Sequence, residues 1–424
     1  MKVAVIGAGA MGLAAAYHAL NAGHEVAVYE GDKIAGGMAA HFDFDGLSIE
    51  RFYHFVCKAD KPLFDLMAEL GIGDKIVWRE TSMGYFVDGE HFAWGDPIAL
   101  LKFPKLSLTA KFRYGLQMFL QTKRRGWDDL EKVNAKDWFI KWIGPKAYDV
   151  LWRRLLELKF FEYADNISAA WMATRIKRVG TSRKSLLQEE LGVIDGGSQT
   201  LVDALVAAIT RKGGTIRLGT PAREIVARDG QVFGVRTDAG AERFDRVIST
   251  VPTPYVAALI PALPEAMKGR YDAIKNIGVV CVLLKLTRPV SRHFWLNIND
   301  KTIDIPGIVE FSNLRRLPNT VVYIPYYMPQ THQKFSKPTE YFIEEAFSYI
   351  EKINPALHRT DLIASHVGRL RYAQPVCEPG FLAKIPPVET PIKGLQVADT
   401  CYYYPEDRGI SESVRFAKLM VERL

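Results

Sequence analysis

The hydrophobic pattern is clearest at the start of the chain. Residues 2–6 and 25–29 are two short apolar runs of the kind that a strand buried on both faces requires. Between them, residues 13–22 form a largely apolar stretch of helical length that ends before Gly23. The pattern predicts a strand, a helix and a second strand, which together open an α/β fold.

A glycine-rich turn joins the first predicted strand to the helix. Its sequence, GAGAMG, matches the GxGxxG motif in the strand–turn–helix context that the motif requires. Gly7 permits the tight turn, Gly9 lets the backbone approach a pyrophosphate, and Gly12 lets the helix pack against the strand. Phosphates are expected on the free N–H groups of the helix N-terminus. The residues predicted to bind a dinucleotide here are Gly7, Gly9, Ala10, Met11 and Gly12.

The second predicted strand ends in an acid, Glu30, a little over twenty residues after the first glycine. A carboxylate at this place can accept both ribose hydroxyls of an adenosine and repels a 2'-phosphate. The paired glycines Gly36 and Gly37, followed by Met38, favour FAD over NAD. Flavoproteins of the glutathione reductase and amine oxidase type resemble this stretch, with paired glycines where the chain passes the pyrophosphate again.

The rest of the chain alternates between strand and helix patterns. Residues 42–55 predict a hairpin that turns at Asp45-Gly46, and residues 98–188 are mainly helical, as in a cap-like insertion. Strand patterns return between residues 192 and 251. A further block follows, with strands expected at 279–286 and 320–327 and a helix at 339–353.

These patterns predict an α/β fold with a Rossmann-like FAD-binding domain of the glutathione reductase type and an inserted α+β substrate domain. The FAD-binding domain is expected to be discontinuous, at residues 1–58, 190–253 and 386–424. The substrate-binding domain with its helical cap is expected at residues 59–189 and 254–385.

The C-terminal forty residues carry a second cofactor signal. A strand that ends in Asp399 is followed by a loop and then by Gly409, Ile410 and Ser411, which begin the last helix. This order resembles the C-terminal FAD motif of the superfamily of amine oxidases, protoporphyrinogen oxidases and phytoene desaturases. The resemblance implies that Asp399 binds the ribityl chain and that the helix N-terminus lies under the pyrimidine end of the isoalloxazine. It also places the apolar residue that contacts the adenine near Ile225.

Three departures from this superfamily narrow the expected chemistry. Ala398 replaces the usual glycine before the C-terminal acid, and Met38 stands where amine oxidases have an arginine. The lysine that holds a water molecule near flavin N5 in many amine oxidases falls near Val282. Lys285 is close, but three residues further along a strand it points to the other face. We therefore expect hydride removal from carbon, as in protoporphyrinogen oxidases or desaturases, rather than amine oxidation.

Composition and charge do not decide whether the protein contacts a membrane. The 424 residues include 48% hydrophobic ones, enough for two domains with cores. The net charge is +7, and residues 97–127 contain seven basic residues and no acidic ones, interleaved with apolar residues. This segment suits the anionic surface of a membrane. The alternative, which we favour, is a helical subdomain whose apolar face packs inward. No motif for nucleic-acid recognition accompanies the charge.

The four cysteines are widely spaced and show neither a CxxC pair nor metal-ligand spacing. They suit reduced thiols in a cytoplasm, and we predict no metal site. No stretch approaches the eighteen apolar residues that a membrane span requires. The expected location is therefore the cytoplasm, with peripheral contact at the inner face of a membrane left open.

Three residues are catalytic candidates. Arg51 and His54 lie beyond the first hairpin, where the chain of this superfamily often passes the flavin, and His54 can donate to a substrate oxygen or shuttle a proton. Packing of His54 within an aromatic cluster is the alternative. Arg408 is expected either beside the flavin carbonyls or in a salt bridge with Glu406 or Asp407.

The sequence thus predicts an FAD-dependent oxidoreductase that removes hydride from an apolar or amphipathic small molecule, with an electron acceptor that it does not identify. Two alternatives stay open. UDP-galactopyranose mutases have a similar FAD fold and a similar aromatic stretch with a histidine after the paired glycines, and they carry out no net redox reaction. Rab GDP-dissociation inhibitors resemble the fold without using a flavin, although the intact glycine set and Glu30 argue against them.

Overall fold

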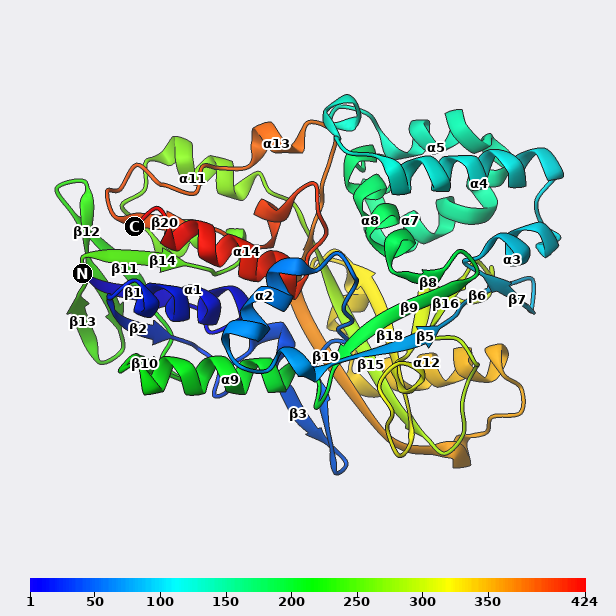
Figure 1. The fold of residues 1–424 in the computed structure, drawn as a ribbon, viewed down its shortest axis with the longest axis horizontal. Coiled ribbons are helices and arrows are strands. Elements are labelled where there is room, and N and C mark those ends of the chain that lie inside the picture. Colours follow the sequence, from blue (N-terminus) through cyan, green and yellow to red (C-terminus); the bar gives the residue numbers. More distant parts are fainter.

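The computed structural model describes residues 1–424. One half of the molecule is built on a five-stranded parallel sheet in the order β10-β2-β1-β14-β20 (Figure 1). Because the strands are parallel, their carboxyl ends lie at one edge of the sheet, where α/β proteins bind ligands. The strands are β1 (Lys2–Ile6), β2 (Glu25–Tyr29), β10 (Thr215–Arg217), β14 (Arg246–Ser249) and β20 (Leu395–Val397).

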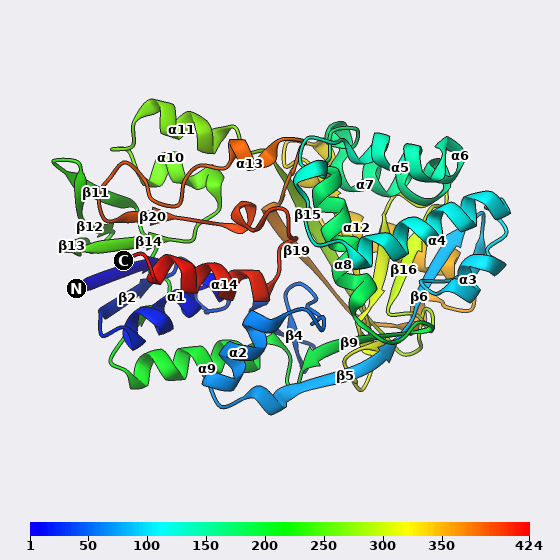
Figure 2. The same cartoon turned by 45° about the horizontal axis from the view of Figure 1, so that its top comes forward.

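Helices from both ends of the chain pack together in this half. The first helix contacts the last helix and α9, and the last helix also contacts α2 (Figure 2). Helices α1 and α14 are therefore neighbours although almost the whole sequence separates them. This contact is necessary if the two predicted cofactor motifs bind one FAD molecule. The helices are α1 (Ala10–Asn21), α2 (Lys61–Glu69), α9 (Ser198–Arg211) and α14 (Ile410–Val421).

A small antiparallel sheet in the order β11-β12-β13 adjoins the parallel one. Asp229 and Gly230 form the turn between its first two strands, both with positive φ. The elements are β11 (Glu224–Arg228), β12 (Gln231–Thr237), β13 (Gly240–Arg243), α10 (Val256–Leu259) and α11 (Glu265–Asp272).

The other half contains a seven-stranded mixed sheet in the order β19-β15-β18-β17-β16-β6-β7. Helix α12 (Thr339–Ile353), at the residues where a helix was predicted, packs on one face of this sheet and buries a separate apolar cluster there. The strands are β6 (Met83–Val87), β7 (Glu90–Trp94), β15 (Asn276–Leu286), β16 (Trp295–Ile298), β17 (Gly307–Glu310), β18 (Thr320–Met328) and β19 (Leu362–Pro375).

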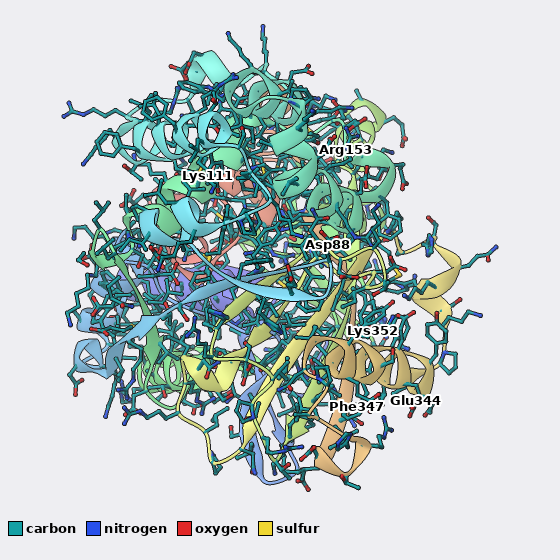
Figure 3. All side chains as sticks on the ribbon, turned by 90° about the vertical axis from the view of Figure 1, so that its right-hand side faces the viewer. Asp88, Lys111, Arg153, Glu344, Phe347 and Lys352 are labelled. Carbon is teal, nitrogen blue, oxygen red and sulfur yellow. The ribbon has the colours of Figure 1, made fainter.

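The predicted helical cap lies beside this sheet (Figure 1). Figure 3 looks onto this end of the molecule, with Lys111 and Arg153 on the cap and Glu344, Phe347 and Lys352 on α12 at the opposite side. The cap helices are α3 (Pro97–Lys102), α4 (Leu108–Lys123), α5 (Ala135–Ile143), α6 (Pro145–Tyr148), α7 (Arg154–Phe160) and α8 (Ala169–Thr181).

Short elements connect the two halves. The hairpin β3–β4 turns at Asp45 and Gly46 as predicted, and both residues have positive φ. The strand pattern after Gly192 does not join the parallel sheet, because β9 pairs antiparallel with β5 and β8 instead. These elements are β3 (His41–Phe44), β4 (Leu47–Glu50), β5 (Ile76–Thr81), β8 (Arg183–Ser185), β9 (Gln188–Ile194) and α13 (Phe381–Lys384).

The orientation predicted for the apolar residues of α4 is wrong. The buried side chains of this helix are polar, namely those of Lys111, Gln117 and Gln121. Leu108, Phe112, Leu116, Phe119 and Leu120 are exposed instead, with Leu108 and Phe112 76% and 72% exposed, whereas Ala110 and Tyr114 pack against the core. Lys111 Nζ donates to the carbonyl oxygen of Leu101 at 2.6 Å, whereas both side-chain amide atoms of Gln117 have no hydrogen-bond partner. None of the helices combines the length and the apolar character that crossing a bilayer requires.

Candidate functional site

A cavity of about 1700 Å³ lies between the two halves and extends under the cap. The glycine turn after β1, the end of β2, the paired glycines and the start of α14 all contribute to its wall. The cavity therefore brings the two predicted cofactor segments together. The predicted residues that line it are Gly7, Gly9, Ala10, Met11, Glu30, Gly36, Gly37, Met38, Arg51, His54, Asp399, Arg408, Gly409, Ile410 and Ser411.

The glycine turn is closed by contacts that leave no room for side chains. A Cβ atom on Gly12 would lie 1.9 Å from the carbonyl oxygen of Gly7, so only glycine lets α1 start this close to β1. Gly7 has φ of 102°, and the hydroxyl of Thr250 fills the space beside it. Gly12 does not line the cavity, and its role in the structure is this packing.

The other side of the turn is open. A Cβ atom on Gly9 would meet nothing within 4 Å, and Gly9 caps α1 without a side-chain hydrogen bond to the first helical N–H groups. The amide of Gly36 donates to the carbonyl oxygen of Ala8 at 2.7 Å, which holds the paired glycines against the turn. Free amides at the N-terminus of a helix form an anion site, so this cradle fits a pyrophosphate.

Glu30 is held at the edge of the cradle by two backbone amides. Its carboxylate accepts from Ala8 N at 2.7 Å and from Asp32 N at 2.9 Å. A carboxylate has about four acceptor positions, so positions remain for the hydroxyls of a ribose. Arg51 reaches the same region and pairs with Asp32, with Nη1 and Oδ2 2.5 Å apart. Arg51 thus lies at the nucleotide end of the cavity.

The C-terminal segment faces the cradle from β20. Asp399 is buried, and its two oxygens accept from the amides of Thr253 at 2.6 Å and Cys401 at 2.8 Å. Burial raises the pKa of this carboxyl, against the effect of these donors. Helix α14 begins at Gly409 without a side-chain cap, and the buried hydroxyl of Ser411 has no hydrogen-bond partner in the protein. These unused polar groups fit the far end of a flavin dinucleotide.

His54 lines the cavity, and its buried Nδ1 has no hydrogen-bond partner. Burial lowers the pKa of His54 to about 4, against the weaker effect of Glu50. The imidazole is therefore neutral near pH 7 and can donate through one nitrogen and accept through the other. The preceding residue, Tyr53, packs against Trp295 and Tyr323.

Arg408 forms neither of the salt bridges considered from the sequence. Its guanidinium donates to the carbonyl oxygen of Ala373 and lies 3.4 Å from the hydroxyl oxygen of Tyr327. Asp407 pairs with Arg175 of α8 instead. Arg408 thus presents its charge to the cavity beside the start of α14.

One buried cation in the cavity was missed in the sequence. Lys159 of α7 is only 8% exposed, yet its ammonium has no hydrogen-bond acceptor or carboxylate partner. Three rings surround it, with Nζ 5.2 Å, 5.3 Å and 5.6 Å from the ring centroids of Tyr327, Trp171 and Phe160. Burial, reinforced by the positive charge of Arg175, lowers its pKa well below the usual range. A lysine followed by two phenylalanines in residues 155–161, where Glu157 is the other charged residue, was the available signal.

Two sequence assignments require correction. Val282 packs in the cluster under α12, whereas the cavity face of β15 presents Val279 and Cys281. Lys285 does lie on the face opposite to Val282, but it binds the β3–β4 turn and does not line the cavity. No lysine therefore reaches the cavity from β15. Ile225 is fully buried in β11 and is not part of the cavity wall either.

Comparison with known proteins extends these observations. The family model for flavin containing amine oxidoreductase matches residues 12–401. A 15-cis-phytoene desaturase of Synechococcus elongatus is 26% identical over 377 residues, which cover 82% of this chain and 75% of that protein. The chain also matches plant zeta-carotene desaturases, but the match spans about half of their length.

Solved structures with the same fold cover the whole chain. A protein from Exiguobacterium sp. 255-15 that is described as a candidate protoporphyrinogen oxidase superposes with a TM-score of 0.77 and 18% identity, over 100% of this chain and 98% of the other. A reduced UDP-galactopyranose mutase superposes with a TM-score of 0.76 and 16% identity, over 100% and 95%. At such identities the likeness shows the fold alone. The family match covers more than nine tenths of the chain, so this protein belongs to the flavin containing amine oxidoreductases and is an oxidoreductase with a flavin cofactor.

Proposed function

We propose that the protein uses FAD to remove hydride from an apolar or amphipathic small molecule. The observation that supports this most directly is the continuity of the cavity. Its walls run from the dinucleotide cradle at Gly9 to the aromatic and aliphatic side chains under the cap, such as Trp171 and Phe160. A substrate in the apolar part therefore shares one enclosed space with the flavin.

The chain's own residues hold FAD at four places in this proposal. The turn at Gly9 binds the pyrophosphate, Glu30 the adenosine ribose, and Asp399 the ribityl chain. Amine oxidases have an arginine at the position of Met38. In this proposal Arg51, which approaches the cradle from the hairpin, supplies the corresponding positive charge. The N-terminus of α14 stabilises negative charge at the pyrimidine end, by about 1 kcal/mol when partly buried.

Bound FAD supplies a two-electron acceptor for hydride. Removing a hydride and a proton from adjacent carbons leaves a double bond, so the protein must exclude water and receive one proton. The apolar walls exclude water, and neutral His54 offers a free ring nitrogen for a proton or for a substrate oxygen. The lysine of β15, Lys285, binds the β3–β4 turn and lies outside the cavity, which favours oxidation at carbon over oxidation of an amine.

The decisive experiment follows the colour of the flavin. The cofactor is released from the purified protein and identified by mass, and FAD is expected. The holoprotein is then mixed without oxygen with 15-cis-phytoene, zeta-carotene, protoporphyrinogen or a UDP-sugar. Bleaching by one of the first three supports the proposal. Protection of the protein by the UDP-sugar with no bleaching by any compound would instead favour a mutase-like reaction.

The outer surface of α3 and α4 suggests how an apolar substrate arrives. Phe112, Leu116 and Phe119 are exposed and also line the cavity, which places its mouth among apolar side chains. We propose that this surface docks on an anionic bilayer at the inner face of a cytoplasmic membrane. Lys102, Lys123 and Arg125 surround it and have no carboxylate partner, which complements anionic headgroups.

A further inference from the structure

The inner part of the cavity carries more positive than negative charge. Lys159, Arg175 and Arg408 meet there from α7, α8 and the segment before α14, and we call these three residues the basic pocket. The carboxylate next to them belongs to Asp407. Burial would raise the pKa of Asp407, but Arg175, Lys159 and Arg408 together lower it, so Asp407 is ionised.

Asp407 does not satisfy the whole basic pocket. Its Oδ2 is bound by Arg175, and its buried Oδ1 has no hydrogen-bond partner. Arg408 has only a carbonyl and a phenol as acceptors, and Lys159 has none. An amino group that lacks an acceptor, on a side chain more than nine tenths buried, is unfavourable in a folded protein unless a ligand supplies an acceptor, and an anionic ligand also stabilises its charged form. The aromatic rings around Lys159 offset part of that cost but cannot accept its three hydrogen bonds.

The surroundings of the basic pocket are apolar. Phe160 and Trp171 flank Lys159, and the cavity continues from there to Phe112 and Phe119 on α4. A ligand that fills both regions must therefore combine an anionic head with a long apolar body.

We propose that the basic pocket binds the acidic head group, a carboxylate or a phosphate monoester, of an amphipathic substrate whose apolar chain extends toward α4. This inference rests on the proposed function and specifies its substrate class. Lys159 donates to the head-group oxygens, Arg408 adds a second cation, and Arg175 stays paired with Asp407. Aromatic rings flank this region, so the charge-assisted hydrogen bonds to the head group are strong.

The test is equilibrium binding to the oxidised holoprotein, which requires no turnover. Oleic acid, oleyl phosphate and oleyl alcohol share one chain and differ in the head, and their binding is followed by calorimetry. We expect at least one of the two acids to bind roughly tenfold or more tightly than the alcohol. The substitution Lys159→Met should remove this difference and leave the alcohol unaffected. Lys146→Met, on an exposed lysine of the same cap, should behave like the parent protein.

The variant is expected to fold, because methionine fills a similar volume and removes an unpaired buried charge. We therefore expect the melting temperature of Lys159→Met to equal or exceed that of the parent. If it does not fold, Lys159→Arg keeps the charge and should retain the preference for the acid. Equal affinity for acids and alcohol in the parent would overturn the proposal. Unchanged acid binding in Lys159→Met, with loss of flavin, would also overturn it and assign the charge to the cofactor.

These outcomes are independent of the proposed reaction. A protein that binds the acids through Lys159 but is bleached by no substrate would contradict the dehydrogenation and leave the head-group site intact. A protein that is bleached by a hydrocarbon but shows no preference for acids would support the dehydrogenation and contradict the head-group site.

Discussion

The ammonium of Lys285 lies 2.8 Å from the Oδ2 atom of Asp45, and it also donates to the Asp45 carbonyl oxygen at 2.8 Å. Lys285 belongs to β15, which lies between β19 and β18 in the seven-stranded sheet, and Asp45 belongs to the turn of the first hairpin. The pair therefore joins the two halves of the molecule at the C-terminal end of β15. The two partners differ in solvent exposure: the Lys285 side chain is 8% exposed and that of Asp45 is 53% exposed.

Replacing Asp45 by asparagine tests this junction. Asparagine tolerates the positive φ of the turn and keeps its polar atoms, so the change removes mainly the charge that faces a buried lysine. Water screens part of the interaction, and we expect a loss of about 1 kcal/mol in the free energy of unfolding, measured with urea. The matched control is Asp229→Asn, in an Asp-Gly turn of similar φ for which the structure shows no ion pair. Equal losses in the two variants would refute a specific role for the pair.

Gly9 and Gly12, the second and third glycines of the turn, should respond differently to replacement by alanine. Gly12→Ala places a methyl group 1.9 Å from a backbone carbonyl oxygen, so α1 must shift from β1. We expect protein that is poorly folded and has a lowered melting temperature. Gly9→Ala meets no protein atom within 4 Å and has a backbone conformation open to alanine.

Gly9→Ala should therefore fold normally but lose flavin, because its methyl group occupies the space into which a pyrophosphate must come. Flavin content per chain and the melting temperature of the flavin-free protein separate the two effects. A Gly9→Ala protein with full flavin content would show that the cofactor does not use this cradle.

Local signals explain which parts of the site could be predicted from the sequence. The turn at residues 7–12, Glu30 and the start of α14 are short motifs whose chemistry lies within a few residues, and all three line one cavity. The face of β15 could not be fixed in the same way. An alignment error of one residue along a strand exchanges its two faces, which is why Val282 was placed at the cavity instead of Cys281 or Val279.

Features that depend on distant segments were not predictable. Lys159 is distinctive only because α8 and the segment before α14 bring Arg175 and Arg408 beside it. The helical pattern of α4 was recognised, but the pattern gives no sign of which side meets the protein. Strand β19 was missed because most of its residues are only partly buried and its apolar positions are sparse.

The low pKa of His54 leads to a prediction about pH. The pKa is about 4 in the folded protein, lowered by burial, and about 6.5 in the unfolded chain. Between these values the unfolded chain binds more protons than the folded protein, so stability falls as the pH decreases through this window. His54→Gln removes this titration. The free energy of unfolding of the variant should therefore fall less than that of the parent between pH 7 and pH 5, and identical slopes would show that His54 is accessible to solvent protons.

The outward apolar face of α4 leads to the last prediction, on membrane binding. Phe112 and Phe119 are 72% and 55% exposed, an arrangement that is unfavourable in water and favourable in the interfacial region of a bilayer. Replacing both by glutamine should weaken binding to vesicles of phosphatidylglycerol and phosphatidylcholine by at least about tenfold. Added salt should weaken binding of the parent through Lys102, Lys123 and Arg125.

The control replaces Leu218 and Leu382 by glutamine. These residues are 41% and 62% exposed but lie outside the cap, so this double variant has lost a similar exposed apolar area from other surfaces. Sedimentation with the vesicles measures both proteins under the same conditions. Equal binding of the two double variants would contradict docking through α4, because it would show that general surface hydrophobicity is sufficient. Binding that is lost only in the α4 variant would place the cavity mouth at the membrane, where an amphipathic substrate can enter with its acidic head directed toward Lys159.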